Sequence, residues 1–285
     1  MYTDKTILIT GATGSFGSAF IRNLQETPAK KLIVFSRCWL KQKDLRDSLG
    51  NPSFMRWFIG DIRDKDRLIR ATEGVDIVIH AAAIKDLEAC EYNPSEAMLT
   101  NVTGTQNVID ACIANKVSKC LLISTDKAVD PANTYGTSKA MAERLWLNGN
   151  YYAANDNIKF SVCRYGNVVG SNGSVVPVFK KMISEGKKTL PVTHPDMTRF
   201  WMEMKGAVDF VKQSIRNMEG GEIFIPVLPS VRITDLCEAL QMQYDIVGIR
   251  KGEKLHETMG QGFDSGSNSW FLSVEEIRDS ILNVV

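Results

Sequence analysis

The chain lacks the cysteine and histidine patterns of secreted and metal-binding proteins. None of its six cysteines forms a Cys-x-x-Cys pair, and its three histidines share no spacing typical of metal ligands. This argues against a disulfide framework and against a zinc site. Most cysteines lie in apolar segments, which predicts buried, reduced thiols.

The chain also lacks a charge excess, a long apolar run and any repeat or low-complexity tract. A net charge of +1 argues against general affinity for nucleic acid. No apolar run approaches the ~20 residues of a membrane-spanning helix. The N-terminus shows no cationic region followed by an apolar stretch, as a signal peptide would. We therefore expect a cytoplasmic protein that binds neither nucleic acid nor a membrane.

Short apolar runs alternate with helix-spaced segments through the first half of the chain. The 285 residues are 44% hydrophobic, enough for a large core. Helix spacing recurs near residues 16–25, 66–72, 94–115 and 135–148. Repeated strand–helix units predict an α/β fold with a doubly wound parallel sheet, the Rossmann architecture. The predicted strands, each buried on both faces, are Thr6–Ile9, Leu32–Phe35, Trp57–Ile59, Ile77–Ile79, Cys120–Ile123 and Phe160–Cys163.

The alternation loosens after about residue 165. Val175–Gly186, Gly206–Met218 and Arg232–Gln241 are predicted helices, and Ile223–Ile225 is a predicted strand. Gly260–Ser269 is rich in Gly and Ser and predicts a loop. We divide the chain into a cofactor-binding Rossmann domain, residues 1–165, and a smaller C-terminal substrate-binding lobe, residues 166–285, interleaved with the last sheet elements.

A glycine-rich segment follows the first predicted strand and opens the first predicted helix. Glycines there let backbone N–H groups and the positive helix N-terminus approach a pyrophosphate. The alternative is a plain glycine-rich turn, which the chain position and the five strands behind it disfavour. The predicted contacts to a dinucleotide are Gly11, Thr13, Gly14, Ser15, Phe16 and Gly17.

The end of the second predicted strand indicates NADP rather than NAD. NAD-binding proteins usually carry an acidic residue there for the ribose 2′-hydroxyl. This chain has Ser36-Arg37 instead, and a guanidinium suits a 2′-phosphate. The alternative is that Arg37 stacks on the adenine.

Further cofactor contacts are expected after the later strands. Asp61 and Ile62 are candidates for the adenine, and Ala82 gives close backbone approach. Asn101 lies mid-helix, where asparagine is a poor helix former. It is a candidate to hold a water or a backbone kink near the site, although a solvated helix face is an equal alternative.

Tyr135-x-x-x-Lys139 and the preceding Asp126-Lys127 carry the candidate chemistry. Four-residue spacing places Tyr135 and Lys139 on one helix face. A nearby ammonium favours phenolate, so the tyrosine can take a proton from an alcohol. Asp126 and Lys127 add an acid and a base, enough to expel a neighbouring hydroxyl and move a C–H proton. The alternative for this pair is a surface salt bridge.

Together these residues resemble the inverting UDP-N-acetylglucosamine 4,6-dehydratases of the extended short-chain dehydrogenase/reductase superfamily. The resemblance covers nearly residues 4–258, whereas the segment after it, Thr258–Val285, is shorter than family members usually carry. It is carried by Ser124-Thr125-Asp126-Lys127-Ala128, Arg164-Tyr165-Gly166-Asn167-Val168, Gly173-Ser174-Val175-Val176-Pro177, Thr198-Arg199-Phe200-Trp201 and the run from Gly248 to Glu257.

The resemblance implies an internal oxidation, an elimination and a reduction. Tyr135 with Lys139 removes the 4-hydroxyl proton while hydride passes to NADP⁺. Lys127, as a neutral amine, takes the C5 proton, and Asp126 protonates the departing 6-hydroxyl. Hydride then returns to C6 and a proton adds to the opposite face of C5, which gives a UDP-2-acetamido-2,6-dideoxy-L-hexos-4-ulose. Lys127 must have a lowered pKa for this role.

The resemblance also implies a site for a UDP-sugar. Arg250 suits the diphosphate, Glu253 the ribose hydroxyls, and Asn167 is a further diphosphate donor. Arg199 is expected either at the sugar or diphosphate or in a pair with a carboxylate. The remaining candidates are Thr125 for catalysis and Lys85, Val175 and Thr193 for the substrate; further copies of the chain are the other expected partner.

Three other functions are compatible with parts of this pattern. A UDP-sugar 4-epimerase uses the same oxidation but generally lacks the Asp126-Lys127 pair. A retaining 4,6-dehydratase typically has Asp-Glu at these positions. An NADP-sensing protein without turnover often loses the Tyr-x-x-x-Lys pair, which this chain keeps.

Overall fold

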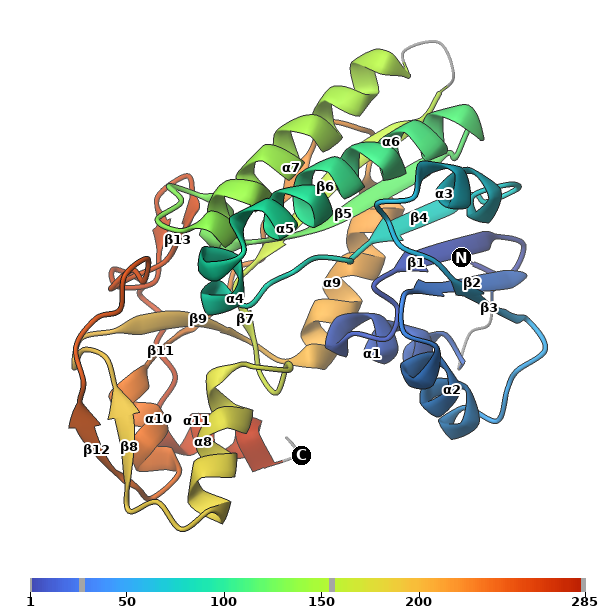
Figure 1. Cartoon of the computed structure of the whole chain (residues 1–285). Helices are drawn as coiled ribbons and strands as arrows, with labels where there is room; N and C mark the ends of the chain where they lie inside the picture. Colours follow the sequence, from blue (N-terminus) through green and yellow to red (C-terminus); the bar gives the residue numbers. More distant parts are fainter. Residues whose placement is uncertain (1, 26–28, 154–156, 283–285) are drawn as a thin grey trace.

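The computed structural model describes residues 2–25, 29–153 and 157–282 and contains a large parallel sheet (Figure 1). Its strand order is β10-β6-β5-β4-β1-β2-β3, the doubly wound arrangement. All six predicted strands are confirmed, and the predicted strand at 223–225 pairs with β6 at the sheet edge. The strands are β1 Thr6–Thr10, β2 Lys31–Ser36, β3 Met55–Ile59, β4 Ile77–His80, β5 Lys119–Thr125, β6 Lys159–Tyr165 and β10 Ile223–Phe224.

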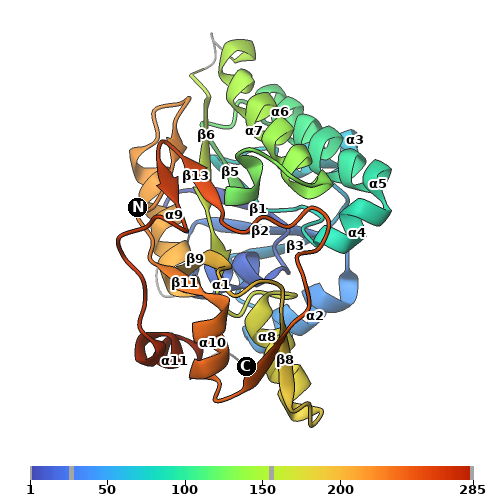
Figure 2. The same cartoon turned by 90° about the vertical axis from the view of Figure 1, so that its left-hand side faces the viewer.

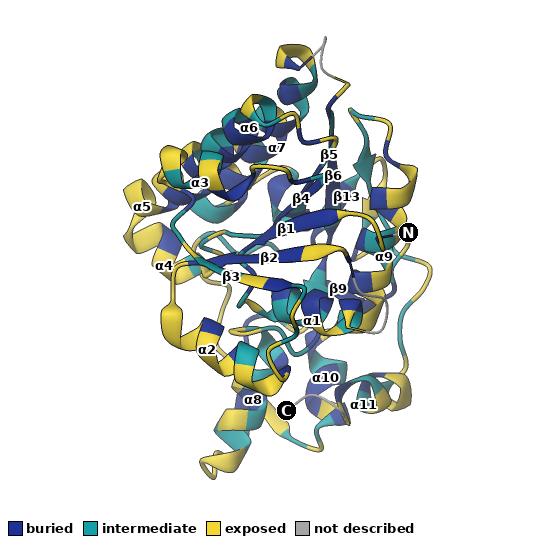
Figure 3. Ribbon diagram, turned by 90° about the vertical axis from the view of Figure 1, so that its right-hand side faces the viewer, coloured by how far each residue is buried: buried dark blue, intermediate teal, exposed yellow. Residues whose placement is uncertain are grey.

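Helices cover both faces of this sheet, as Figures 1 and 3 show. One core packs α1 (Ser15–Leu24), α2 (Trp39–Ser48) and α9 (Met204–Asn217) against one face. A second core packs α3 (Lys65–Ala71), α6 (Gly104–Ala114) and α7 (Thr134–Tyr152) against the other. Because apolar side chains meet helices on both sides, every residue of β1 and β4 is buried.

The helix expected at residues 94–115 is interrupted. Here α4 (Leu87–Tyr92) and α5 (Pro94–Met98) lead into a π-helical turn, η1 (Leu99–Thr103), before α6 begins. A π-helical turn is rare and is found mainly where a side chain must be redirected for function or packing. It turns the segment so that Asn101 is buried rather than solvated.

The second half of the chain adds a C-terminal lobe with its own core (Figure 2). The predicted helices at 175–186, 206–218 and 232–241 are present, the second being α9. The expected loop at Gly260–Ser269 is wrong in part, because its first residues pair in a hairpin, β13 with β14. The lobe's elements are β7 Asn167–Val168, α8 Val175–Ser184, β8 Thr189–Val192, β9 Thr198–Met202, β11 Ser230–Arg232, α10 Ile233–Ala239, β12 Gln243–Ile246, β13 Thr258–Gly260, β14 Phe263–Asp264 and α11 Val274–Leu282.

Two further properties bear on the composition. Among the helices that the structure describes, none is long and apolar enough to cross a membrane. All six cysteines are free; Cys38 is exposed and the other five are buried.

Candidate active site

A cavity of about 770 Å³ opens where the carboxyl ends of the parallel strands face the C-terminal lobe. In doubly wound sheets, ligands bind outside these strand ends, where the strand order reverses. The cavity wall contains every predicted site residue except Asp126 and Asn101. These are Gly11, Thr13, Gly14, Ser15, Phe16, Gly17, Ser36, Arg37, Asp61, Ile62, Ala82, Lys85, Thr125, Lys127, Tyr135, Lys139, Asn167, Val175, Thr193, Arg199, Arg250 and Glu253.

The glycine-rich turn is shaped for a pyrophosphate. Gly11 has φ +65°, and a Cβ there would lie 2.7 Å from the backbone nitrogen of Ala82, so a side chain cannot be accommodated. Within the described residues, no side chain caps the start of α1 and its first turn carries no acidic residue. The first N–H groups of this helix are therefore available to an anion. These features fit a dinucleotide.

The corner expected to select the cofactor contains a carboxylate that the second strand alone did not reveal. Asp61, after β3, has Oδ2 3.8 Å from Arg37 NH1 and 2.7 Å from Arg63 NH2. The Oγ of Ser36 accepts a hydrogen bond from Gln42 Nε2 at 3.0 Å. Arg37 remains 57% exposed and thus accessible to a ligand.

Asn101 is buried behind the cavity wall rather than in it, and its place among the cofactor contacts stays a prediction. Its Oδ1 accepts from the Ile84 N–H at 2.8 Å, and its Nδ2 donates to the Ile84 carbonyl at 2.9 Å and to Ser138 Oγ at 2.9 Å. With these bonds, Asn101 joins η1 to the segment after β4 and to α7. It shapes the site through its neighbours.

Helix α7 carries Tyr135 and Lys139 into the cavity. Its N-cap, Asn133, accepts a hydrogen bond from Gly136 N at 2.7 Å. Lys139 Nζ donates to the Ile123 carbonyl at 2.8 Å, and burial lowers the pKa of Lys139 to about 8, against the opposing charge of Glu143. The ammonium therefore remains the main form at neutral pH.

The phenol of Tyr135 is more weakly acidic than the sequence suggested. Burial, followed by the charge of Asp126, raises the pKa of Tyr135, and a hydrogen bond with Thr125 acts in the opposite direction. The predicted shift toward phenolate is thus wrong for this state of the protein, because burial penalises the charged form.

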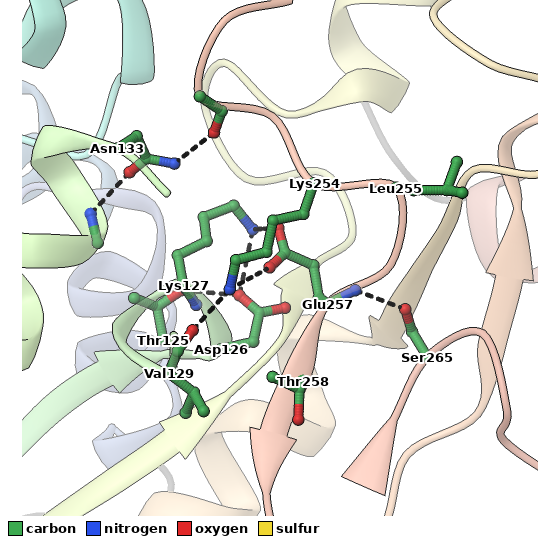
Figure 4. Close-up of polar contacts among 12 residues, drawn as sticks. Thr125, Asp126, Lys127, Val129, Asn133, Lys254, Leu255, Glu257, Thr258 and Ser265 are labelled. Atoms are coloured by element: carbon green, nitrogen blue, oxygen red, sulfur yellow. Dashed lines mark hydrogen bonds and ion pairs between the residues drawn. The ribbon is translucent and has the colours of Figure 1, made fainter. Parts of the chain in front are cut away.

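Lys127 lies in a buried cluster of polar groups (Figure 4). Its Nζ is 3.1 Å from Asp126 Oδ1, 3.2 Å from Asn167 Oδ1 and 3.2 Å from Glu257 Oε1. Burial favours the neutral amine, but the carboxylates of Asp126 and Glu257 outweigh it, so the pKa of Lys127 is raised. The expectation of a lowered pKa is therefore wrong for the resting site.

Asp126 lies behind Lys127 rather than in the cavity wall. Its side chain is 0% exposed, which rules out the surface salt bridge considered as an alternative. Its Oδ1 accepts from Thr125 Oγ1 at 2.9 Å as well as from Lys127. Among the described residues, its Oδ2 has no hydrogen-bond partner. Two residues that contact it, Thr125 and Lys127, line the cavity.

Glu257 is a residue of the site that the sequence did not reveal. It lines the cavity and contacts Lys127, although the two residues lie far apart in the chain. The run that ends in His256-Glu257 was the available signal, but its contact with Lys127 forms only in the fold. His256 itself is bonded to Thr198 Oγ1 at 2.8 Å and does not line the cavity.

Residues 250–257, here called the 250–257 loop, lie against the turn that carries Lys127. The Asn133 side chain donates to the Gly252 carbonyl at 2.8 Å, and Lys254 Nζ donates to the Val129 carbonyl at 2.6 Å. Arg199 donates to the carbonyls of residues 198, 254 and 255. It braces this loop and, among the described residues, pairs with no carboxylate.

The predicted substrate residues surround the same space with polar groups. Glu253 Oε2 accepts from the Arg250 backbone N–H at 3.3 Å, and both residues line the cavity. Lys85 Nζ is 3.5 Å from Ser171 Oγ, and burial lowers the pKa of Lys85. Arg250 and Lys85 therefore place basic side chains in the cavity wall.

Known proteins share this sequence and this fold over nearly its whole length. The family described as "Polysaccharide biosynthesis protein" matches residues 7–273. A Campylobacter jejuni protein named UDP-N-acetylglucosamine 4,6-dehydratase (inverting) is 51% identical over 99% of this chain and 85% of its own. A Rickettsia conorii protein named UDP-glucose 4-epimerase is 42% identical over 91% of this chain and 78% of its own.

Two solved structures illustrate the likeness in space. The X-ray structure of Pen from Bacillus thuringiensis has a TM-score of 0.94 and 34% identity, covering 99% of this chain and 98% of that one. A dTDP-glucose 4,6-dehydratase from Streptomyces venezuelae, solved with NAD and TYD bound, has a TM-score of 0.82 at 21% identity, covering 97% and 95%. The chain therefore belongs to the polysaccharide biosynthesis protein family, within the extended short-chain dehydrogenase/reductase superfamily.

Proposed function

We propose that the protein is a UDP-N-acetylglucosamine 4,6-dehydratase that inverts C5. The observation that carries this proposal is Lys127, an amine held between two carboxylates on the wall that also presents Tyr135 and Lys139. A simple alcohol oxidation needs no such group. The 51% identity to the Campylobacter jejuni protein of that name supports the same activity.

The cofactor proposed for this site is NADP. The glycine-rich turn and the start of α1 would hold the pyrophosphate, and Arg37 would face the 2′-phosphate. Lys41 lines the same part of the cavity and adds a second positive charge. When bound, a nicotinamide supplies a hydride acceptor for C4 and a hydride donor for C6. The division into a cofactor domain ending at residue 165 and a substrate lobe follows from these assignments.

Tyr135 and Lys139 would take the proton of the 4-hydroxyl. Lys139 follows Tyr135 by one helical turn and donates to the Ile123 carbonyl, and in the proposed step its positive charge would offset part of the cost of a buried phenolate. The keto group formed at C4 makes the C5 proton more acidic. The next step needs a base at C5.

Lys127 and Asp126 can become base and acid in one transfer. A proton that moves from Lys127 Nζ to Asp126 Oδ1, 3.1 Å away, breaks an N–H bond and forms an O–H bond without changing the net charge. It leaves a neutral amine to take the C5 proton and a carboxylic acid to protonate the departing 6-hydroxyl.

The UDP part of the substrate would lie along the C-terminal lobe. Arg250, Asn167 and Lys85 would contact the diphosphate, and Glu253 the ribose. Val175 and Thr193 line the lobe side of the cavity, beyond the catalytic residues. The proposed roles of these residues in substrate binding rest on their positions in the cavity wall.

The second candidate, a UDP-sugar 4-epimerase, is favoured by the Rickettsia relatives. Both activities start with oxidation at C4, but only a dehydratase eliminates water. Incubation of the purified protein with UDP-N-acetylglucosamine, followed by mass spectrometry, separates them. We expect a product that has lost one water; a product of unchanged mass with only C4 inverted would instead establish the epimerase.

A further inference from the structure

Glu257 presents a buried carboxylate to Lys127. It is 2% exposed, and its backbone N–H donates to Ser265 Oγ at 2.8 Å, which fixes its place at the end of the 250–257 loop. Its Oε1 lies 3.2 Å from Lys127 Nζ. Its Oε2 accepts no hydrogen bond from the described residues, and Lys254 Nζ is 3.8 Å away.

The proposed elimination creates a positive charge next to this carboxylate. Lys127 starts the step as an amine, and the C5–H bond breaks as an N–H bond forms on Nζ. Asp126 has by then received a proton and no longer balances that charge. A buried ammonium without a counter-ion is strongly disfavoured. Glu257 is the carboxylate in contact with Lys127 that keeps its charge through the step.

We propose that Glu257 is a positioning residue that holds Lys127 toward C5 and balances its charge as it accepts the C5 proton. This inference rests on the proposed function. Glu257 acts through Lys127 and takes no proton itself.

Other charged groups around Lys127 also influence whether it keeps its proton. Asp126 precedes it on the same turn, Arg199 faces it from β9, and Lys85 faces it from the segment after β4. Lys254 lies on the far side of Glu257. Arg199 and Lys85 favour loss of the Lys127 proton, whereas Asp126 and Glu257 favour its retention. Removal of Glu257 alone should therefore shift the balance toward loss.

The test is the pH profile of deuterium incorporation at C5 in heavy water, measured for wild type and Glu257→Gln at saturating UDP-N-acetylglucosamine. The variant should exchange C5 roughly 10²-fold more slowly. The alkaline limb of its pH profile, where Lys127 loses its proton, should move to lower pH because an anion that favours the ammonium is gone. C4 oxidation, followed by the absorbance of reduced nicotinamide, and KM should change little.

Glu253→Gln is the matched control from the same loop. It should alter KM and leave the alkaline limb at the wild-type pH. Two results would overturn the proposal and leave Glu257 a structural residue of the loop. One is an alkaline limb of the Glu257→Gln pH profile at the wild-type pH; the other is an equal loss of C4 oxidation and C5 exchange.

Glu257→Asp provides a second route if the glutamine variant does not fold. This variant keeps the carboxylate on a side chain one methylene shorter, so the alkaline limb of its pH profile should stay at the wild-type pH while the rate of C5 exchange falls. An alkaline limb at lower pH would contradict the assignment. Absence of C5 exchange in the wild type would count against the proposed function itself, not against this role of Glu257.

Discussion

At the scale of single residues, the ionisation of Lys127 depends on two carboxylates from distant parts of the chain. Asp126 is its neighbour, but Glu257 reaches it from the C-terminal lobe. Together they raise the pKa of Lys127 against the effect of burial. In the proposed mechanism, the base at C5 would therefore form by proton transfer inside the cluster rather than from a lysine that is neutral before the reaction.

Substitutions of Lys127 and Tyr135 should block different steps of the reaction. Lys127→Ala should keep cofactor and substrate binding and C4 oxidation but lose dehydration by a factor of roughly 10²–10⁴, because the C5 base is gone. Tyr135→Phe should block C4 oxidation itself. Single-turnover absorbance of reduced nicotinamide, combined with product analysis, distinguishes the two. Loss of C4 oxidation in Lys127→Ala would refute this division of roles.

Arg37 should determine the choice between NADP and NAD. Arg37→Asp removes a guanidinium from the 2′-phosphate position and should weaken NADP binding by about 1.5–3 kcal/mol, as expected for a charge-assisted hydrogen bond. Titration calorimetry with both cofactors measures this. Arg56→Asp, an exposed residue outside the cavity wall, is the control. Equal affinity of the wild-type protein for NAD and NADP would show that Arg37 has another role.

At the scale of helices and loops, the π-helical turn η1 supports the site from behind. Asn101 uses its whole amide to join this turn to Ile84 and Ser138. Gly136 on α7 shows how closely the neighbouring elements fit, because a Cβ there would lie 2.2 Å from the Lys127 carbonyl oxygen. The close contact with α7 therefore helps to fix the position of the turn that carries Lys127.

Asn101→Ala should lower the free energy of unfolding by about 1–3 kcal/mol, since it leaves partly buried backbone groups of Ile84 without partners. Asn107→Ala is the matched control, because the Asn107 side chain also bonds two backbone carbonyls but is only half-buried. Its effect should be smaller. Denaturant unfolding gives both values, and a loss in Asn107→Ala equal to that in Asn101→Ala would contradict the argument.

Local patterns account for the elements that could be predicted from the sequence. Strands buried on both faces appear in the sequence as apolar runs, and the turn after the first strand is marked by closely spaced glycines. Both features can therefore be predicted from the sequence. The contacts that were missed join distant segments: Glu257 with Lys127, and Asp61 with Arg37. The direction of the Tyr135 and Lys127 pKa shifts was missed for the same reason, since burial and charge depend on the completed fold.

At the scale of the whole molecule, His80 links stability to pH. It is buried between Thr10 and Thr105, and burial, followed by the charge of Lys139, lowers its pKa to about 3. Between pH 6.5 and 3 the unfolded chain therefore binds a proton that the folded protein excludes, and stability falls as pH is lowered through this window. His80→Gln should flatten this dependence. Equal slopes in the two proteins, measured by denaturant unfolding at several pH values, would exclude His80 as a cause.

The parallel sheet and the C-terminal lobe meet at the cavity that contains the candidate site. We expect homo-oligomers in the cytoplasm, which sedimentation of the purified protein and fractionation of cells would test. Neither expectation enters the chemistry proposed above, which uses residues of a single chain.

The central claim is that Lys127 removes the C5 proton and that a proton returns to the opposite face. Turnover of UDP-N-acetylglucosamine in heavy water, followed by NMR of the product, tests it most directly. We predict a 6-deoxy-4-keto sugar with inverted C5 and solvent-derived deuterium at that carbon. A product with the original C5 configuration, or one without solvent label at C5, would contradict the account.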